Sequence, residues 1–213
     1  LTLLMPLTAH AQNAPTVIEI YTSTRCPQCP NADTNFKKYI DQNPNAIGLS
    51  CHVTYFNRSN RTDILSQPFC NARQMQYTKT LKTGGTFTPL VVINGQDYTT
   101  GTKTGQIEFI AKGDKVQTPH RITLSQNGKI LDINLPPLRI NGTADLWLIQ
   151  SYKTPPFTNY EDYPNSVKNI TKLLNWNGKK TSMAFPIDNN KNTNYTIIAQ
   201  TAKNGIIAAG QVK

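Results

Sequence analysis

The sequence predicts a mixed α/β unit in the first half of the chain and an all-β unit in the second half. Up to residue 113, segments of strand composition alternate with segments of helical periodicity. After residue 113, short strand-like segments follow one another, and Asn-Gly pairs lie between or beside them as turns. The chain of 213 residues is long enough for two small domains, which we expect at residues 12–113 and 114–213.

The expected order of elements in the first unit is β-α-β-α-β-β-α. Prolines near helix starts, Asn43-Pro44 after the first helix and Gly84-Gly85 after the second provide start and stop signals. The predicted strands are residues 16–22, 46–56, 90–93 and 96–100, and the predicted helices are residues 29–41, 68–82 and 105–112. This order is the minimal thioredoxin arrangement, and the handedness of parallel connections leaves few other ways to fold it.

In the second unit, seven short strands over about 95 residues favour a β-sandwich. They are expected at residues 120–125, 129–135, 143–152, 170–176, 181–186, 195–201 and 206–212. Residues 154–168 form a long connection that contains proline and tyrosine.

The first eleven residues are apolar and uncharged and end in Ala9-His10-Ala11, as the end of a secretory signal peptide does. Cleavage after Ala11 would start the mature protein near Gln12, in the periplasm or outside the cell, where disulfides persist. No apolar run reaches 18 residues, so no membrane-spanning helix is expected. The net charge of +10 is spread along the chain, which argues against nucleic-acid binding and permits weak attraction to an anionic envelope surface.

The motif Cys26-Pro27-Gln28-Cys29 lies where the first strand ends and the first helix begins. The partial positive charge of a helix N-terminus stabilises a thiolate, so we expect Cys26 to attack and Cys29 to resolve the mixed disulfide. A plain structural bridge and half of a zinc site are the other uses of such a pair. A structural zinc site needs a second ligand pair, and none is present.

Two further candidate site residues accompany the motif. Pro89 follows Thr88 directly before an apolar strand, where a cis proline would face Cys26 and Cys29 and leave the Thr88 backbone free to pair with substrate. The alternative is an ordinary trans proline at the start of a strand. Glu19 lies in an otherwise apolar strand, either as a buried acid that helps deprotonate Cys29 or as a solvent-facing residue of an edge strand.

The other two cysteines, Cys51 and Cys70, allow three interpretations: a structural bridge, a second redox couple that passes electrons to the first, or two free buried thiols. His52 should point to the opposite face of its strand from Cys51, so these two residues are not expected to bind a metal together. The sequence therefore predicts no metal site and no cofactor.

Four segments resemble, in order, the bacterial exported thioredoxin-like family catalogued as domain of unknown function 1223. They are VIEIYTSTRCPQCPNAD, LSCHVTYF, PFCNARQMQY and TFTPLVVING, and SVKNITKLLNWNG resembles the C-terminal β domain of that family. The resemblance marks Glu19, Thr22, Ser23, Cys26, Cys29, Pro30, Asp33, His52, Tyr55, Phe69, Arg73, Gln74, Tyr77, Thr88 and Pro89. Pro27-Gln28, Cys51 and Cys70 depart from the family pattern, and the resemblance implies redox proteins without an established substrate.

These observations predict an exported thiol-disulfide oxidoreductase that acts on protein or peptide thiols or disulfides in the bacterial envelope. Two alternatives of other classes remain. One is a redox-inert thioredoxin-like scaffold or binding protein. The other is a Cu(I)-handling protein that uses the thiolates of Cys26 and Cys29. The direction of electron flow, the oligomeric state and the role of the second unit are left open.

Overall fold

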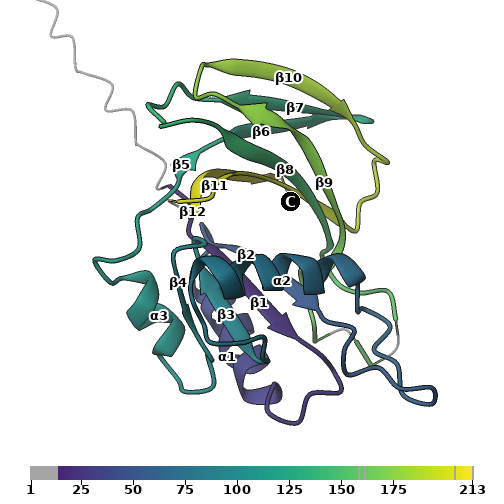
Figure 1. Cartoon of the computed structure of the whole chain (residues 1–213). Helices are drawn as coiled ribbons and strands as arrows, with labels where there is room; N and C mark the ends of the chain where they lie inside the picture. Colours follow the sequence, from purple (N-terminus) through teal and green to yellow (C-terminus); the bar gives the residue numbers. More distant parts are fainter. Residues whose placement is uncertain (1–13, 158, 161, 204, 213) are drawn as a thin grey trace, which may run out of the picture.

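The computed structural model describes residues 14–157, 159–160, 162–203 and 205–212, so the predicted signal peptide lies outside the described residues. The first half has the expected order of elements (Figure 1). They are β1 (Val17–Thr22), α1 (Pro30–Gln42), β2 (Ile47–His52), α2 (Pro68–Thr80), β3 (Leu90–Ile93), β4 (Asp97–Thr99) and α3 (Gln106–Ala111). The second strand is shorter than predicted, because the chain turns away from the sheet after His52.

The second half contains eight strands in its described residues, one more than predicted. They are β5 (His120–Arg121), β6 (Thr123–Asn127), β7 (Ile130–Leu135), β8 (Ala144–Tyr152), β9 (Val167–Trp176), β10 (Thr181–Pro186), β11 (Thr193–Thr201) and β12 (Gly205–Val212). The segment predicted as one strand at residues 120–125 divides at Ile122, since β5 pairs with β12 and β6 pairs with β7. Gly210 allows this crossing, because a Cβ atom there would lie 2.2 Å from the carbonyl oxygen of Ile122.

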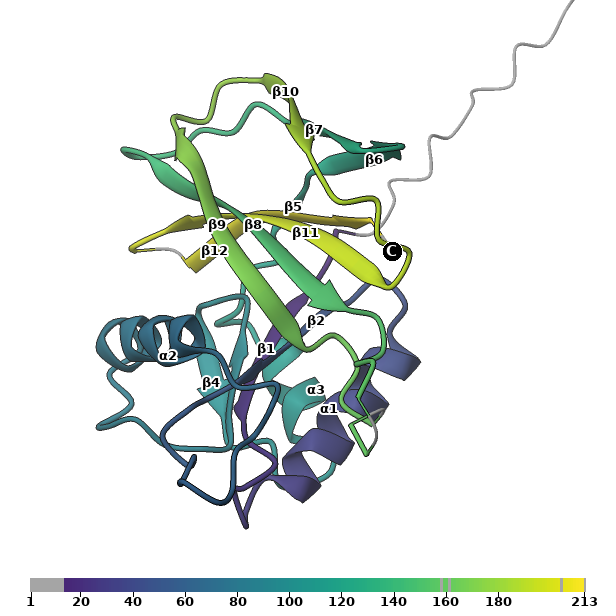
Figure 2. The same cartoon turned by 90° about the vertical axis from the view of Figure 1, so that its right-hand side faces the viewer.

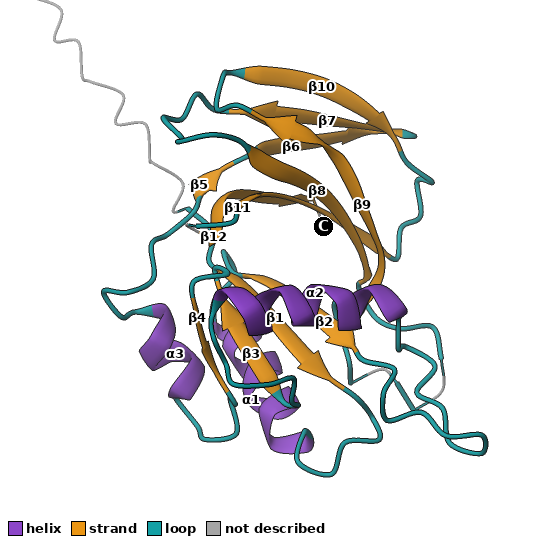
Figure 3. Cartoon of the chain, in the orientation of Figure 1, coloured by secondary structure: helices purple, strands orange, loops and turns teal. Residues whose placement is uncertain are grey.

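The first half is built around a four-stranded sheet with the strand order β2-β1-β3-β4. Strand β1 runs parallel to β2 and antiparallel to β3, so it is central, and all six of its residues are buried. Helices α1 and α3 cover one face of the sheet, and α2 covers the other (Figure 3). The turn that follows β1 carries Cys26 and therefore lies at the C-terminal end of this strand, where α1 begins.

The second half contains two sheets that face each other. One has the order β10-β7-β6, and the other has the order β5-β12-β11-β8-β9. Alternate residues of β7 are buried, and Leu131, Ile133 and Leu135 pack against residues of β8 and β11 such as Leu146 and Ile197. The alternating pattern in the sequence thus corresponds to one face in the core and one face toward solvent.

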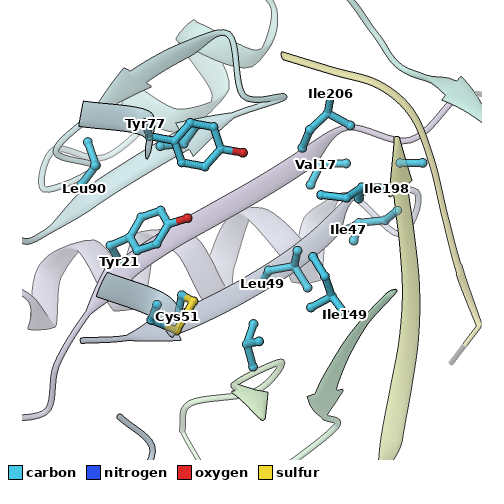
Figure 4. Packing of buried hydrophobic residues seen from close by; sticks show 14 of the residues in the cluster. Val17, Tyr21, Ile47, Leu49, Cys51, Tyr77, Leu90, Ile149, Ile198 and Ile206 are labelled. Carbon is cyan, nitrogen blue, oxygen red and sulfur yellow. A yellow bond between two sulfur atoms is a disulfide. The ribbon is translucent and has the colours of Figure 1, made fainter. Parts of the chain in front are cut away.

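The opposite face of the five-stranded sheet packs directly on the first half (Figure 2). Ile149, Ile198 and Ile206 from this sheet share one buried cluster with Leu49 of β2 and Tyr77 of α2 (Figure 4). The two halves of the chain therefore have a common core at their junction.

A contact between the turn after β3 and the start of β12 lies at the same junction. The Ile206 N–H donates to the carbonyl oxygen of Asn94 over 2.8 Å. Gly205 has a φ of 66°, and a Cβ atom at this position would lie 2.6 Å from the same carbonyl oxygen. Glycine is therefore required at Gly205 by both its backbone conformation and the close approach.

Candidate functional site

Cys26 and Cys29 form a disulfide with a Cα–Cα distance of 5.4 Å. The turn after β1 is fixed by the Cys26 N–H, which donates to the carbonyl oxygen of Ser23 over 3.0 Å. Cys29 is the N-cap of α1, and Pro30 begins the helix, where the missing N–H of proline costs nothing. Cys26 is 5% exposed and Cys29 is fully buried, so Cys26 is the more accessible of the two residues.

The structure places Thr88 against this sulfur. The Thr88–Pro89 peptide bond is cis, and the Thr88 hydroxyl donates to the Cys26 Sγ atom over 3.3 Å. The loop before β3 is held from α2, because the Gln74 side-chain amide donates to the carbonyl oxygen of Phe87 over 2.6 Å. Three segments far apart in the sequence, carrying Cys26, Gln74 and Thr88, therefore meet at the candidate site.

Glu19 lies on the α2 side of the sheet and is 2% exposed. Its carboxylate accepts hydrogen bonds from Arg73 Nε over 2.5 Å and Arg73 Nη2 over 2.9 Å. The Tyr77 hydroxyl and the Tyr21 hydroxyl also donate to it. Among the described residues, no hydrogen bond joins Glu19 to either cysteine of the CxxC motif. Its contacts are those of a buried ion pair between β1 and α2, and its role in deprotonating Cys29 stays a prediction.

A second carboxylate, Asp33, lies one helical turn after Cys29. The Asp33 N–H donates to the Cys29 carbonyl oxygen over 2.9 Å, and residues four apart share one face of a helix. Burial raises the pKa of Asp33 to about 6, against the lowering effects of the Thr22 hydroxyl and of His52. The sequence marked Asp33 and His52 as part of a pattern but gave them no role. The spacing of four residues between Cys29 and Asp33 is the signal in the sequence that could have assigned Asp33 to this site.

A polar cluster fixes the loop of residues 57–66 to the turn that carries Cys26. His52 Nδ1 lies 2.8 Å from Asp63 Oδ2. The same oxygen accepts from the Thr24 N–H over 2.8 Å and from the Ser23 hydroxyl over 3.2 Å. Burial raises the pKa of Asp63, but the bond to His52 and two backbone N–H groups outweigh it and the pKa is lowered. Asp63 was not recognised in the sequence, because it lies in a polar loop without periodicity.

Cys51 and Cys70 form a second disulfide, also with a Cα–Cα distance of 5.4 Å. Cys51 is 2% exposed and Cys70 is fully buried. The bond joins β2 to the first turn of α2, the helix that carries Arg73 and Gln74. The two cysteines are therefore paired rather than free, and the bond tethers the helix that supports both Glu19 and the loop before Thr88.

The described residues contain no group of three His, Cys, Asp or Glu side chains that could hold a metal ion. No helix in the described part of the chain is long and apolar enough to cross a membrane. Fold and disulfides together define a mixed α/β protein with two buried cystines, which is compatible with a periplasmic or secreted location.

The family described as "Protein of unknown function (DUF1223)" matches residues 17–200. The chain belongs to this family, and the resemblance noted in the sequence is confirmed. No curated protein matches the chain.

Two solved structures are similar to this one. A crystal structure of an Agrobacterium tumefaciens protein is 27% identical with a TM-score of 0.78, and the match covers 95% of this chain and 96% of that chain. HBP35 of Porphyromonas gingivalis is 15% identical with a TM-score of 0.64, and the match covers 93% of this chain and 74% of that chain. The second likeness concerns the fold alone.

Proposed function

We propose that this protein is an exported thiol-disulfide oxidoreductase of the bacterial envelope, with a thioredoxin-like domain at residues 12–113 and a β-sandwich-like domain at residues 114–213. The observation that carries the proposal is the contact of Thr88 Oγ1 with Cys26 Sγ at 3.3 Å, at the N-terminus of α1. This contact joins the sulfur of the less buried cysteine to the loop before β3. That loop is the expected substrate-binding segment.

The reactive sulfur is Cys26. In the reduced protein, the unpaired N–H groups at the start of the 13-residue helix α1 favour its thiolate over its thiol. Cys29 is fully buried, so we expect it to react only with a mixed disulfide in which the substrate sulfur is already bonded to Cys26. The difference in burial supports attack at Cys26 and resolution by Cys29.

Oxidation of a substrate dithiol proceeds by two exchanges. A substrate thiolate attacks Cys26 Sγ, the Cys26–Cys29 bond breaks, and Cys29 leaves as a thiolate that takes up a proton. The second substrate thiolate then attacks the substrate sulfur of the mixed disulfide, and Cys26 leaves. Two electrons pass from the substrate to the protein, and the same steps in reverse reduce a substrate disulfide.

Thr88 is suited to hold an extended substrate segment. It lies before β3, and its backbone groups make no hydrogen bond to other residues in the described part of the chain. A substrate backbone can therefore pair with Thr88 beside the Cys26 sulfur, as a strand is added to a sheet edge.

The test is a comparison of Cys26→Ser and Cys29→Ser with the wild-type protein in dithiothreitol-driven reduction of insulin. We expect Cys26→Ser to abolish the activity and Cys29→Ser to accumulate a mixed disulfide at Cys26, detected by mass spectrometry. Unchanged insulin reduction in Cys26→Ser, together with a wild-type Cys26 that alkylates no faster than an ordinary free cysteine, would contradict the proposal.

A redox-inert scaffold is the second candidate, because Cys26 is only 5% exposed. It predicts a Cys26–Cys29 bond that resists millimolar dithiothreitol in the folded protein. Reduction of this bond within minutes, scored by alkylation of Cys26 and Cys29, favours the oxidoreductase over the scaffold.

A further inference from the structure

Three arginines lie in or beside one short loop at the edge of the candidate site. Arg25 directly precedes Cys26, and its Nη2 atom donates to the carbonyl oxygen of Thr62 over 3.3 Å. Arg58 and Arg61 belong to the same loop, and each backbone N–H donates to the other's carbonyl oxygen over 3.0 Å. We call these three residues the arginine rim. All three side chains are exposed.

Hydrogen bonds attach the loop that carries the rim to the turn before Cys26 and connect it to α2. The loop is anchored through Asp63, which accepts from the Thr24 N–H over 2.8 Å and contacts His52. Arg58 Nη1 donates to the carbonyl oxygen of Tyr55 over 3.2 Å. The Tyr55 hydroxyl in turn donates to the Gln74 side chain over 3.3 Å, beside the loop that carries Thr88. The rim therefore borders the place where a substrate segment would meet Cys26 and Thr88.

The positive charge of the rim is not neutralised by the described residues. No carboxylate in the described part of the chain lies within ion-pair distance of Arg25, Arg58 or Arg61. The one acidic residue of the loop, Asp63, is buried and contacts His52.

We infer that the substrate cysteine of this protein lies in an acidic segment, with Asp or Glu beside it. This inference rests on the proposed function and names its substrate class. The segment pairs with Thr88 at the Cys26 sulfur, and its carboxylates face the arginine rim. Exposed charges of this kind raise the association rate more than they strengthen the final complex.

The experiment measures single-turnover exchange between the oxidised protein and reduced peptides in which one cysteine is flanked by two Glu, two Gln or two Lys residues. The variant is Arg58→Glu/Arg61→Glu. The matched control is Lys179→Glu/Lys180→Glu, which changes the net charge equally in the turn between β9 and β10, at the opposite end of the molecule (Figure 1). Rates are compared between proteins on the same peptide, so the thiol pKa of the peptide cancels.

We expect the rim variant to slow exchange with the acidic peptide by about tenfold at low salt, and to speed exchange with the basic peptide. The control should change neither rate by more than about twofold, and the difference should disappear near 1 M salt because the screening length falls to about 3 Å. Arg58 contacts the backbone of its own loop, so Arg61→Glu alone serves as a second variant with the same expected direction.

Exchange with dithiothreitol, which carries no charge, distinguishes a failure of the proposed function from a failure of the acidic-substrate inference. A wild-type disulfide that does not exchange with dithiothreitol overturns the proposed function itself. Normal exchange with dithiothreitol, but equal effects of the rim and control variants on the acidic peptide, overturns the acidic substrate alone. Rim-dependent binding to phosphatidylglycerol vesicles without any preference among the peptides also overturns it, in favour of a membrane surface.

Discussion

Asp33→Asn tests the electrostatics at the start of α1 most directly. Asp33 lies one turn after Cys29 on α1, and burial raises the pKa of its carboxyl group from 3.8 to about 6. The titratable groups that interact with the Asp33 carboxyl from other elements are His52 on β2, Asp63 in the loop of residues 57–66, and Tyr163 before β9. Replacing Asp33 by Asn keeps the shape of the side chain and removes the titration.

The magnitude follows from the two pKa values. A shift from 3.8 to about 6 is about two units, and each unit corresponds to about 1.4 kcal/mol. Ionisation of Asp33 in the folded protein therefore costs up to about 3 kcal/mol. Because the folded pKa is raised, the folded state holds the proton more tightly. The stability that this proton supplies is complete below pH 3.8 and is lost as the pH rises through about 6.

The assay is urea unfolding of the oxidised wild-type protein and of Asp33→Asn between pH 3.5 and pH 7.5. We expect equal free energies of unfolding at pH 3.5, and a variant that is more stable by up to about 3 kcal/mol at pH 7.5. Both proteins carry His52, Asp63 and Tyr163, so the difference between the two curves isolates Asp33.

Asp41→Asn is the control, because Asp41 lies on the same helix, is exposed and, among the residues that the structure describes, forms an ion pair with Lys37 alone. Its effect should stay within about 0.5 kcal/mol at every pH. A difference between wild type and Asp33→Asn that does not change with pH would refute the reasoning.

Two further predictions concern the elements that support the site. The second disulfide joins residues with a sequence separation of 19, so Cys51→Ser/Cys70→Ser should lower the free energy of unfolding, measured in urea, by about 3 kcal/mol. An unchanged free energy of unfolding would show that this disulfide does not stabilise the fold. Glu19→Gln leaves Arg73 buried without its partner and should cost about 3–5 kcal/mol, whereas Glu19→Leu/Arg73→Met should recover much of that loss. A double variant as unstable as the single one would contradict this account.

The elements of the first half follow from local signals in the sequence. The run VIEIYT predicts a strand and proves to be the fully buried β1, and the prolines at residues 30 and 68 begin α1 and α2. The placement of Cys26 at a strand-to-helix turn follows from the same signals. These features depend on neighbours within one turn of chain, which periodicity and turn chemistry describe well.

The parts of the fold and of the candidate site that the sequence did not predict depend on contacts between residues far apart in the chain. Glu19 meets Arg73 across 54 positions, and neither residue carries a local sign of its partner. His52 and Asp63 meet only because β2 and a polar loop converge on the turn before Cys26. Periodicity assigns a face to each residue, but it does not tell which face of another element will lie opposite.

The buried cluster shared by Leu49, Tyr77, Ile149 and Ile198 bears on how the chain can be divided. Residues 12–113 produced alone would expose to water the apolar face that now lies against the five-stranded sheet. Contiguous apolar patches of this kind promote association. Redox measurements on such a fragment would therefore report on a surface that the intact protein conceals, and activity assays belong to the full chain.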